Sequence, residues 1–96
     1  MKIPEKVKVL GHEYSVILID QSQVGEFGST DVNTLTIRLS KNKAQGQIDS
    51  TLLHEIIEAL NHDLELRLEH NQISSLEASL YQVLKDNKLH FDEQGG

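Results

Sequence analysis

The residues of this chain that are best suited to metal binding or catalysis lie in LLHEIIEALNHDLELRLEH, residues 52–70. His54 and Glu58 are four positions apart, so on a helix their side chains would project from one face about a turn apart. An imidazole nitrogen and a carboxylate oxygen held in this way can bind one metal ion, because both occur as zinc ligands at nearly the same distance. Glu55 stands beside them as a candidate base. The HExxE spacing therefore suggests a metal site.

The same pattern has a simpler explanation. Every amphipathic helix carries a polar face, and charged or imidazole side chains occur at this spacing without binding anything. On His54, Glu55 and Glu58 alone, a solvated helix face is the better-supported interpretation. A metal site therefore requires a third ligand from another part of the chain.

The sequence offers three later candidates for the third ligand, His62, His70 and Glu77. His62 is excluded, because it lies eight positions after His54, about 12 Å along a helix, too far for both to bind one ion. In HNQISSLEASLYQVLKDN, helical periodicity predicts one polar stripe, made of His70, Ser74, Glu77 and Tyr81. Antiparallel packing of the two helices would favour Glu77 as the ligand, whereas an inclined crossing near the loop would favour His70. Glu77 also borders apolar positions, where an unpartnered carboxylate is costly to bury.

The first forty residues predict strands. KVKVL (6–10) alternates lysines with apolar residues, and YSVILID (14–20) follows the turn GHE, which predicts a hairpin. The polar, glycine-containing stretch that follows is expected to be a loop with a short strand around residues 24–27. LTIRLS (35–40) again alternates between apolar and polar residues, as a half-buried strand does.

The second half predicts two helices. Asp49 or Ser50 could cap the first helix, a metal helix at about 49–62. Its apolar face would contain Leu52, Leu53, Ile56, Ile57 and Leu60. Its opposite, polar face would contain His54, Glu55, Glu58 and His62. A support helix follows at about 70–87. Its expected core face contains Ile73, Leu76, Leu80, Val83 and Leu84.

These elements predict one α+β domain over residues 1–96, with a small antiparallel sheet of three to four strands followed by two packed helices. Residues 88–96 are expected to form a frayed tail. The net charge of −6 argues against nucleic acid as a partner. The chain has no cysteine, so a metal must be held by histidine and carboxylate. It has no apolar run of membrane-spanning length and no signal-peptide core, so we expect a cytoplasmic protein.

Most of the chain resembles a known family. The stretches KVKVLGHEYSVIL, LTIRLS, STLLHEIIEALN and LEHNQISSLEASLYQVLKDN resemble the small zincin-like metallopeptidase domains of phage and prophage proteins, related to the ImmA/IrrE type. Members usually read HExxH and carry an acidic ligand three residues before an apolar position that opens the support helix. Ile73 matches that position, so His70 stands where an acid is usual and Glu58 where a histidine is usual. This complementary exchange keeps two imidazoles and one carboxylate, and it favours a metal site.

The resemblance implies a function and roles for the site residues. It implies that His54, Glu58 and His70 hold Zn²⁺ for peptide-bond hydrolysis, with Glu55 accepting the proton of the attacking water. Glu77 would bond to the free ring nitrogen of His70, or would replace it as third ligand. Tyr81 could donate a hydrogen bond to the developing oxyanion. An edge strand, possibly LTIRLS, could align an extended peptide by β-addition.

The departure from HExxH keeps a second function open. The domain could be a non-catalytic binding module on a zincin scaffold, with a structural metal or none. In either case the expected partner is a protein or peptide, and a homodimer is plausible for so small a chain. A phage-encoded protein of this kind would act in the host cytoplasm.

Overall fold

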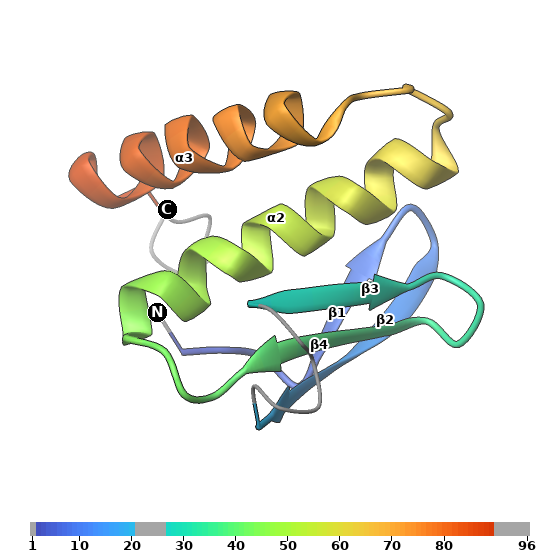
Figure 1. The fold of residues 1–96 in the computed structure, drawn as a ribbon, viewed down its shortest axis with the longest axis horizontal. Helices are drawn as coiled ribbons and strands as arrows, with labels where there is room; N and C mark the ends of the chain where they lie inside the picture. The colour runs from blue at the N-terminus through green and yellow to red at the C-terminus, as the bar shows by residue number, and fades with distance from the viewer. Residues whose placement is uncertain (1, 21–26, 90–96) are drawn as a thin grey trace.

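The computed structural model describes residues 2–20 and 27–89. Over these residues the chain forms three layers, with a four-stranded sheet, the helix α2 packed on it, and the helix α3 packed on α2 (Figure 1). The elements in chain order are β1 (Lys6–Val9), β2 (His12–Ile19), β3 (Gly28–Asp31), β4 (Thr36–Ser40), α2 (Gln45–Asp63) and α3 (His70–Asp86). The predicted α+β fold, a small sheet followed by two packed helices, is confirmed.

The sheet has the strand order β1-β2-β4-β3. The β1–β2 hairpin is antiparallel, as predicted, and β3 pairs with β4 in the same sense. β2 and β4 are parallel neighbours, so the sheet is mixed but mostly antiparallel. The short strand expected around residues 24–27 falls mainly outside the described residues, and β3 begins at Gly28. Since β4 lies between β2 and β3, LTIRLS is not an edge strand as we expected, and β3 is.

A small aliphatic core lies between the sheet and α2. The period-two pattern of β2 and β4 directs Tyr14, Ile37 and Leu39 to one face, and all three are fully buried. From the helix side, Ile48, Leu52 and Ala59 belong to the same cluster. Burial of each large aliphatic side chain contributes about 1.5–3 kcal/mol, and this contact holds α2 against the strands.

Helix α2 begins earlier than its sequence suggested. Its N-cap is Ala44, whose N–H donates to the side chain of Gln47 over 3.3 Å, so the expected cap at Asp49 or Ser50 is wrong. Asp49 instead accepts a hydrogen bond from the side chain of Gln45 at 2.8 Å. Ser50 donates to a residue of α3. Short polar side chains of this kind favour helix ends, but here they satisfy other partners.

The two helices bury different residues from those expected. α2 lies in the middle layer, so Glu55, which the periodicity placed on the face opposite the apolar residues, is only 5% exposed. In α3, only Ile73 of the predicted core face is buried. Leu76, Leu80 and Val83 are 41–44% exposed. The reason is that α3 is the outer layer and makes extensive contacts with α2 but with none of the strands.

Two further expectations concern the ends and the surroundings of the chain. Most of the predicted frayed tail, residues 90–96, lies outside the described residues. Neither α2 nor α3, the helices of the described part of the chain, has the length and apolar character needed to cross a membrane.

Candidate metal centre

Three predicted ligands meet where α2 passes the start of α3. His54 and Glu58 are one turn apart on α2, and His70 is the first residue of α3. One donor atom from each of the three lies within 4.8 Å of the other two. The distance from His54 Nε2 to Glu58 Oε2 is 3.6 Å. The structure therefore brings together the three residues chosen from the sequence, and among the described residues it is His70, not Glu77, that completes the group.

The geometry suits one tetrahedral metal ion. Donor atoms of a four-coordinate zinc are about 3.4 Å apart, which is close to the separation of His54 and Glu58. The rings of His54 and His70 lie 5.5 Å apart, centre to centre, and are inclined by 58°. The His70 side chain is exposed, and its donor atom lies within 4.8 Å of those of His54 and Glu58. Two imidazoles and one carboxylate are a usual donor set of catalytic zinc, which keeps a coordination position open.

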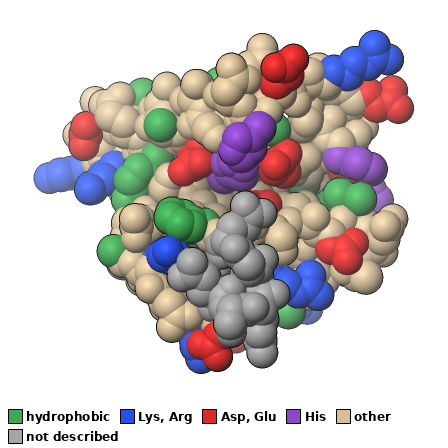
Figure 2. Space-filling view, in the orientation of Figure 1, with side chains coloured by type: hydrophobic (Ala, Val, Ile, Leu, Met, Phe, Trp, Pro, Cys, Tyr) green, Lys and Arg blue, Asp and Glu red, His purple; other side chains and the backbone are tan. Residues whose placement is uncertain are grey.

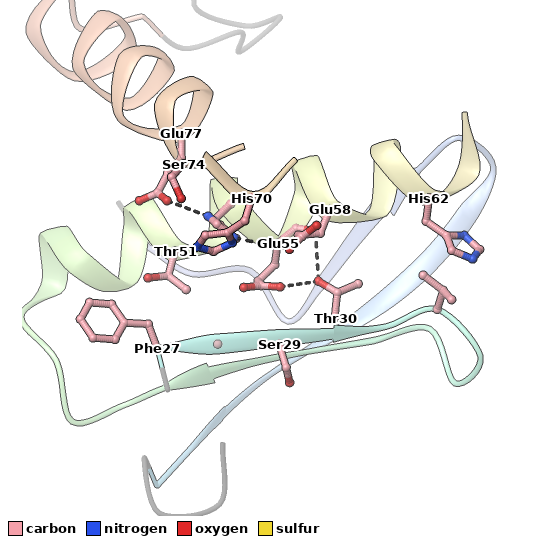
Figure 3. Close-up of a pocket in the computed structure, with 13 residues that line it drawn as sticks. Phe27, Ser29, Thr30, Thr51, Glu55, Glu58, His62, His70, Ser74 and Glu77 are labelled. Carbon is pink, nitrogen blue, oxygen red and sulfur yellow. Dashed lines mark hydrogen bonds and ion pairs between the residues drawn. The ribbon is translucent and has the colours of Figure 1, made fainter. Parts of the chain in front are cut away.

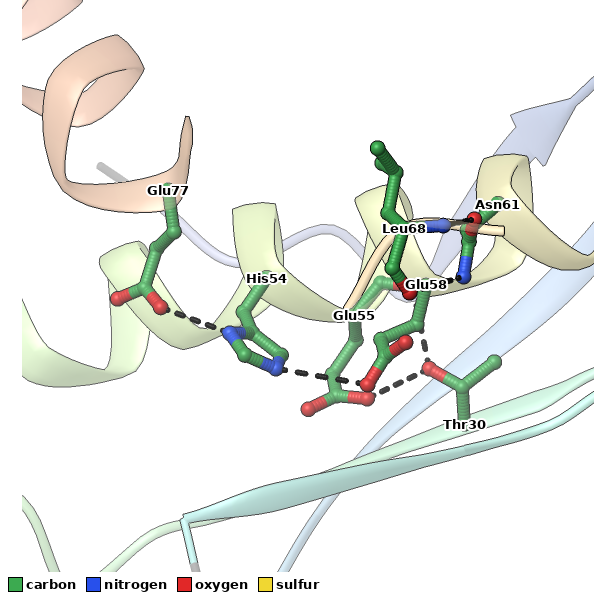
Figure 4. A network of polar contacts seen from close by, with 7 residues as sticks. All are labelled: Thr30, His54, Glu55, Glu58, Asn61, Leu68 and Glu77. Carbon is green, nitrogen blue, oxygen red and sulfur yellow. Dashed lines mark hydrogen bonds and ion pairs between the residues drawn. The ribbon is translucent and has the colours of Figure 1, made fainter. Parts of the chain in front are cut away.

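The loop between the helices determines where His70 lies. The side-chain oxygen of Asn61, near the end of α2, accepts the N–H of Leu68 at 2.8 Å (Figure 4). The N–H of Glu69 donates to the side chain of Gln72 at 2.8 Å, which closes the first turn of α3. These two side-chain contacts fix the path of residues 64–69 and start α3 at His70. Asn61 gives no signal in the sequence, because its partner is a backbone group seven residues away.

Glu77 contacts His54 and Ser50 of α2 rather than His70. Its Oε1 lies 2.8 Å from His54 Nδ1 (Figure 4). Its other oxygen accepts a hydrogen bond from the hydroxyl of Ser50. The expected bond to the ring of His70 is therefore replaced by one to His54. A carboxylate on Nδ1 favours the tautomer that carries its proton there, which leaves Nε2 free toward Glu58.

We predict that Glu77→Ala weakens zinc binding by about tenfold to hundredfold, because His54 loses the partner that fixes its tautomer and orientation. Competition with a chromophoric chelator measures this affinity. Glu77→Gln retains an acceptor for His54, so its zinc affinity should lie between those of the wild type and Glu77→Ala. Glu5 is an exposed carboxylate outside the site, so Glu5→Ala should have the zinc affinity of the wild type. Equal affinity in Glu77→Ala and Glu5→Ala would contradict the assignment.

The buried carboxylate of Glu55 is attached to the edge of the sheet. The hydroxyl of Thr30, in β3, lies 2.7 Å from Glu55 Oε1 and 3.1 Å from the backbone oxygen of Glu55 (Figure 4). Thr30 gives no signal in the sequence, because its contact with Glu55 depends on β3 being the edge strand next to α2. Glu55 is thus held beside the three-residue group without belonging to it.

Gly28 allows β3 to approach α2 this closely. A Cβ at this position would lie 2.8 Å from Thr51 Cγ2, 2.9 Å from the backbone oxygen of Arg38 and 3.3 Å from Glu55 Oε2. Two of these distances are below normal contact, and one of the two neighbours is backbone. A side chain at residue 28 would therefore push the strand away from the helix.

We predict that Gly28→Ala lowers the free energy of unfolding by about 1–3 kcal/mol, as overpacking at a closed contact does. Urea unfolding followed by far-ultraviolet circular dichroism measures it. Ser29→Ala is the matched control, because Ser29 occupies the next position of the strand and points away from α2 (Figure 3). If both variants are as stable as the wild type, the close approach of β3 is not required.

The edge strand ends at a well-defined turn. Asp31 Oδ1 accepts the N–H groups of Thr34 at 3.2 Å and Asn33 at 2.9 Å. Both bonds lower the pKa of Asp31 below its usual value, and the bond from the Thr34 N–H has the larger effect. The side chain is therefore ionised and shapes the turn from β3 into β4 at neutral pH.

A groove of about 790 Å³ runs over these residues, between β3, α2 and the start of α3 (Figure 3). Besides the residues already described, Phe27, Ser74 and His62 line it. In the space-filling view, histidine side chains lie between carboxylates at the centre of this face (Figure 2). The groove gives an extended ligand access to His54, Glu58 and His70.

Two other sequence candidates lie away from the group. The His62 side chain is 63% exposed and its Nδ1 contacts Asp63 at 3.2 Å, in agreement with its exclusion as a ligand. Tyr81 does not line the groove, because its hydroxyl lies beside Gly46 in the first turn of α2. Its predicted role as oxyanion donor therefore has no geometric support.

No protein-family model, curated protein or solved structure matches this chain. The resemblance to zincin-like peptidases stays a prediction, and the function must be argued from the geometry of the site.

Proposed function

We propose that this protein is a zinc-dependent, peptidase-like domain in which His54, Glu58 and His70 bind Zn²⁺. The observation that carries the proposal is the convergence of these side chains from two helices, with their donor atoms within 4.8 Å of one another. The preserved total of two imidazoles and one carboxylate supports it, as does the open groove above the group. Glu58 and His70 exchange the residue types usual in the resembling family, but the donor chemistry is unchanged.

Glu55, Thr30 and Glu77 have different roles in the proposed hydrolysis. A bound Zn²⁺ would supply Lewis acidity and lower the pKa of a water molecule in the groove. Glu55 accepts the proton of the attacking water at its carboxylate and then gives it to the leaving amine. The hydroxyl of Thr30, 2.7 Å away, orients that carboxylate. Glu77 holds His54 in the tautomer that directs Nε2 to the ligand group.

The edge strand β3 is suited to align the substrate. The N–H of Ser40 donates to the carbonyl of Phe27 at 2.8 Å, so bonded and non-bonded pairs alternate from there along β3 and β4. This register turns the backbone groups of Gly28 and Thr30 toward the free edge. An extended peptide adding to β3 would pair with these two residues. Because Thr30 also contacts Glu55, such a peptide would lie next to the base.

The proposal is tested with zinc-loaded protein and a complex mixture of peptides, with new termini identified by mass spectrometry. We expect a limited set of cleavages that disappear with a chelator and return with zinc. Cleavages that persist in the chelator would belong to a contaminating protease. Stoichiometric zinc with no chelator-sensitive cleavage would reject the peptidase function.

One observation favours a second candidate, a binding module stabilised by its metal. Glu55 is only 5% exposed and already bonded to Thr30, and a base in this position must still reach a substrate. In a small core, a metal that joins α2 to α3 would add to stability. This candidate predicts that chelation lowers the melting temperature by several degrees while no peptide is cut.

A further inference from the structure

A second pocket lies beside the groove over His54, Glu58 and His70. This pocket, of about 450 Å³, lies between the first turns of α2 and the second half of α3. Phe27, Thr51 and Glu77 line both the groove and the pocket, so the two are adjacent. We call the second one the α2–α3 pocket.

The wall of the α2–α3 pocket is largely apolar and built around small residues. The rings of Phe27 and Tyr81 and the methyl groups of Ala44 and Ala78 contribute to it. Gly46 leaves room for Tyr81, whose hydroxyl would be 3.3 Å from a Cβ at residue 46. Small residues where two helices face each other leave a space that a ligand side chain can fill.

Two lysines lie over the aromatic rings that line this pocket. Lys85 lines the pocket, with its Nζ 5.7 Å from the centre of the Tyr81 ring. Lys43 holds its Nζ over the Phe27 ring, at 4.2 Å. The face in Figure 2 accordingly has positive side chains beside hydrophobic ones on its left, and carboxylates around the histidines at its centre. In a chain of net charge −6, this end of the groove is suited to an anionic neighbour.

We propose that the α2–α3 pocket binds an apolar side chain of the peptide substrate, and that Lys43 and Lys85 favour an acidic residue next to it. The inference rests on the proposed function, since the peptide is the one that β3 aligns. Phe27 directly precedes Gly28 of the edge strand and lines the pocket, so a peptide paired with β3 can place a side chain there. The class of substrate is therefore a peptide with adjacent apolar and acidic residues.

The test measures peptide binding without cleavage. Zinc-loaded Glu55→Gln protein is labelled with ¹⁵N and titrated with blocked hexapeptides whose central pairs are Leu-Glu, Gly-Glu and Leu-Lys, each with two glycines on either side. We expect Leu-Glu to bind about tenfold more tightly than Gly-Glu, as filling an apolar pocket does. We expect it to bind about threefold more tightly than Leu-Lys, since exposed charge pairs contribute little.

Matched variants locate the effect. Ala78→Leu fills the pocket from an exposed helix position and should abolish the preference for leucine, whereas Ser79→Leu, on the adjacent residue outside the pocket, should retain it. Lys85→Glu should reverse the preference for the acidic peptide, and Lys88→Glu should not. Equal binding of Leu-Glu and Gly-Glu, or an unchanged leucine preference in Ala78→Leu, would overturn the proposal.

The pocket and the metal centre can fail separately. Zinc content and a titration after chelation are measured on the same preparations. If the protein binds no zinc and still prefers leucine, before and after treatment with a chelator, the result would support the pocket and reject the proposed function. Stoichiometric zinc without any leucine preference would reject the proposed role of the pocket but would support the metal centre.

Discussion

Glu55→Gln should reduce peptide hydrolysis by about 10²–10⁴-fold while leaving zinc content and fold unchanged. Glutamine has nearly the same shape and can still accept the hydrogen bond from Thr30, which lies 2.7 Å from Glu55 Oε1. It cannot take a proton from water. Because Glu55 is outside the three-residue group, the substitution removes the base and no ligand. Initial rates on a peptide found in the cleavage screen, with zinc measured on the same sample, give the comparison.

The control for this variant is Glu65→Gln, at an exposed position in the loop after α2. It should hydrolyse the peptide at the wild-type rate. Unchanged hydrolysis in Glu55→Gln would remove Glu55 from the mechanism. If zinc were lost from Glu55→Gln as well, Glu55 would be a ligand, and the proposed division between ligands and base would be wrong.

His70→Ala should weaken zinc binding by roughly 10²–10³-fold, the contribution of one ligand to a site of this type. His70 is exposed and begins α3, so its removal should cost little stability without metal. His62→Ala is the matched control, because His62 is an exposed histidine outside the group. Chelator competition measures both affinities. Full affinity in His70→Ala would mean that another residue is the third ligand.

The exchange of residue types gives an independent check. The double variant Glu58→His with His70→Glu keeps two imidazoles and one carboxylate, so its zinc affinity should stay within about tenfold of the wild type. His70→Glu alone leaves one imidazole and two carboxylates, and should bind more weakly than the double variant. A double variant no better than His70→Glu would show that residues 58 and 70 do not share one ion.

The sequence predicted the features that depend on local spacing. The hairpin β1–β2 and strand β4 follow from alternation along a few residues, and the pairing of His54 with Glu58 follows from the pitch of one helix. These predictions need only neighbours in sequence and a regular backbone. The choice of His70, three residues before the buried Ile73, depended on the family resemblance, because the polar stripe alone left Glu77 as an alternative.

The sequence could not predict features that depend on the stacking of layers. Glu55 was placed on the polar face of its helix and its burial was not predicted, because periodicity does not reveal that α2 has the sheet below it and α3 above. Thr30 and Gly28 gave no signal, since their roles require β3 to be the edge strand against α2. The exposed position of Leu80 has the same cause, because the outer helix contacts one layer only.

The metal content of untagged protein, dialysed against micromolar zinc and then against metal-free buffer, tests the central claim most directly. Elemental mass spectrometry of the wild type and of His54→Ala gives the result. The proposal predicts about one zinc per chain in the wild type and little or none in the variant. No metal in the wild type, or equal zinc in both proteins, would contradict a site formed by His54, Glu58 and His70.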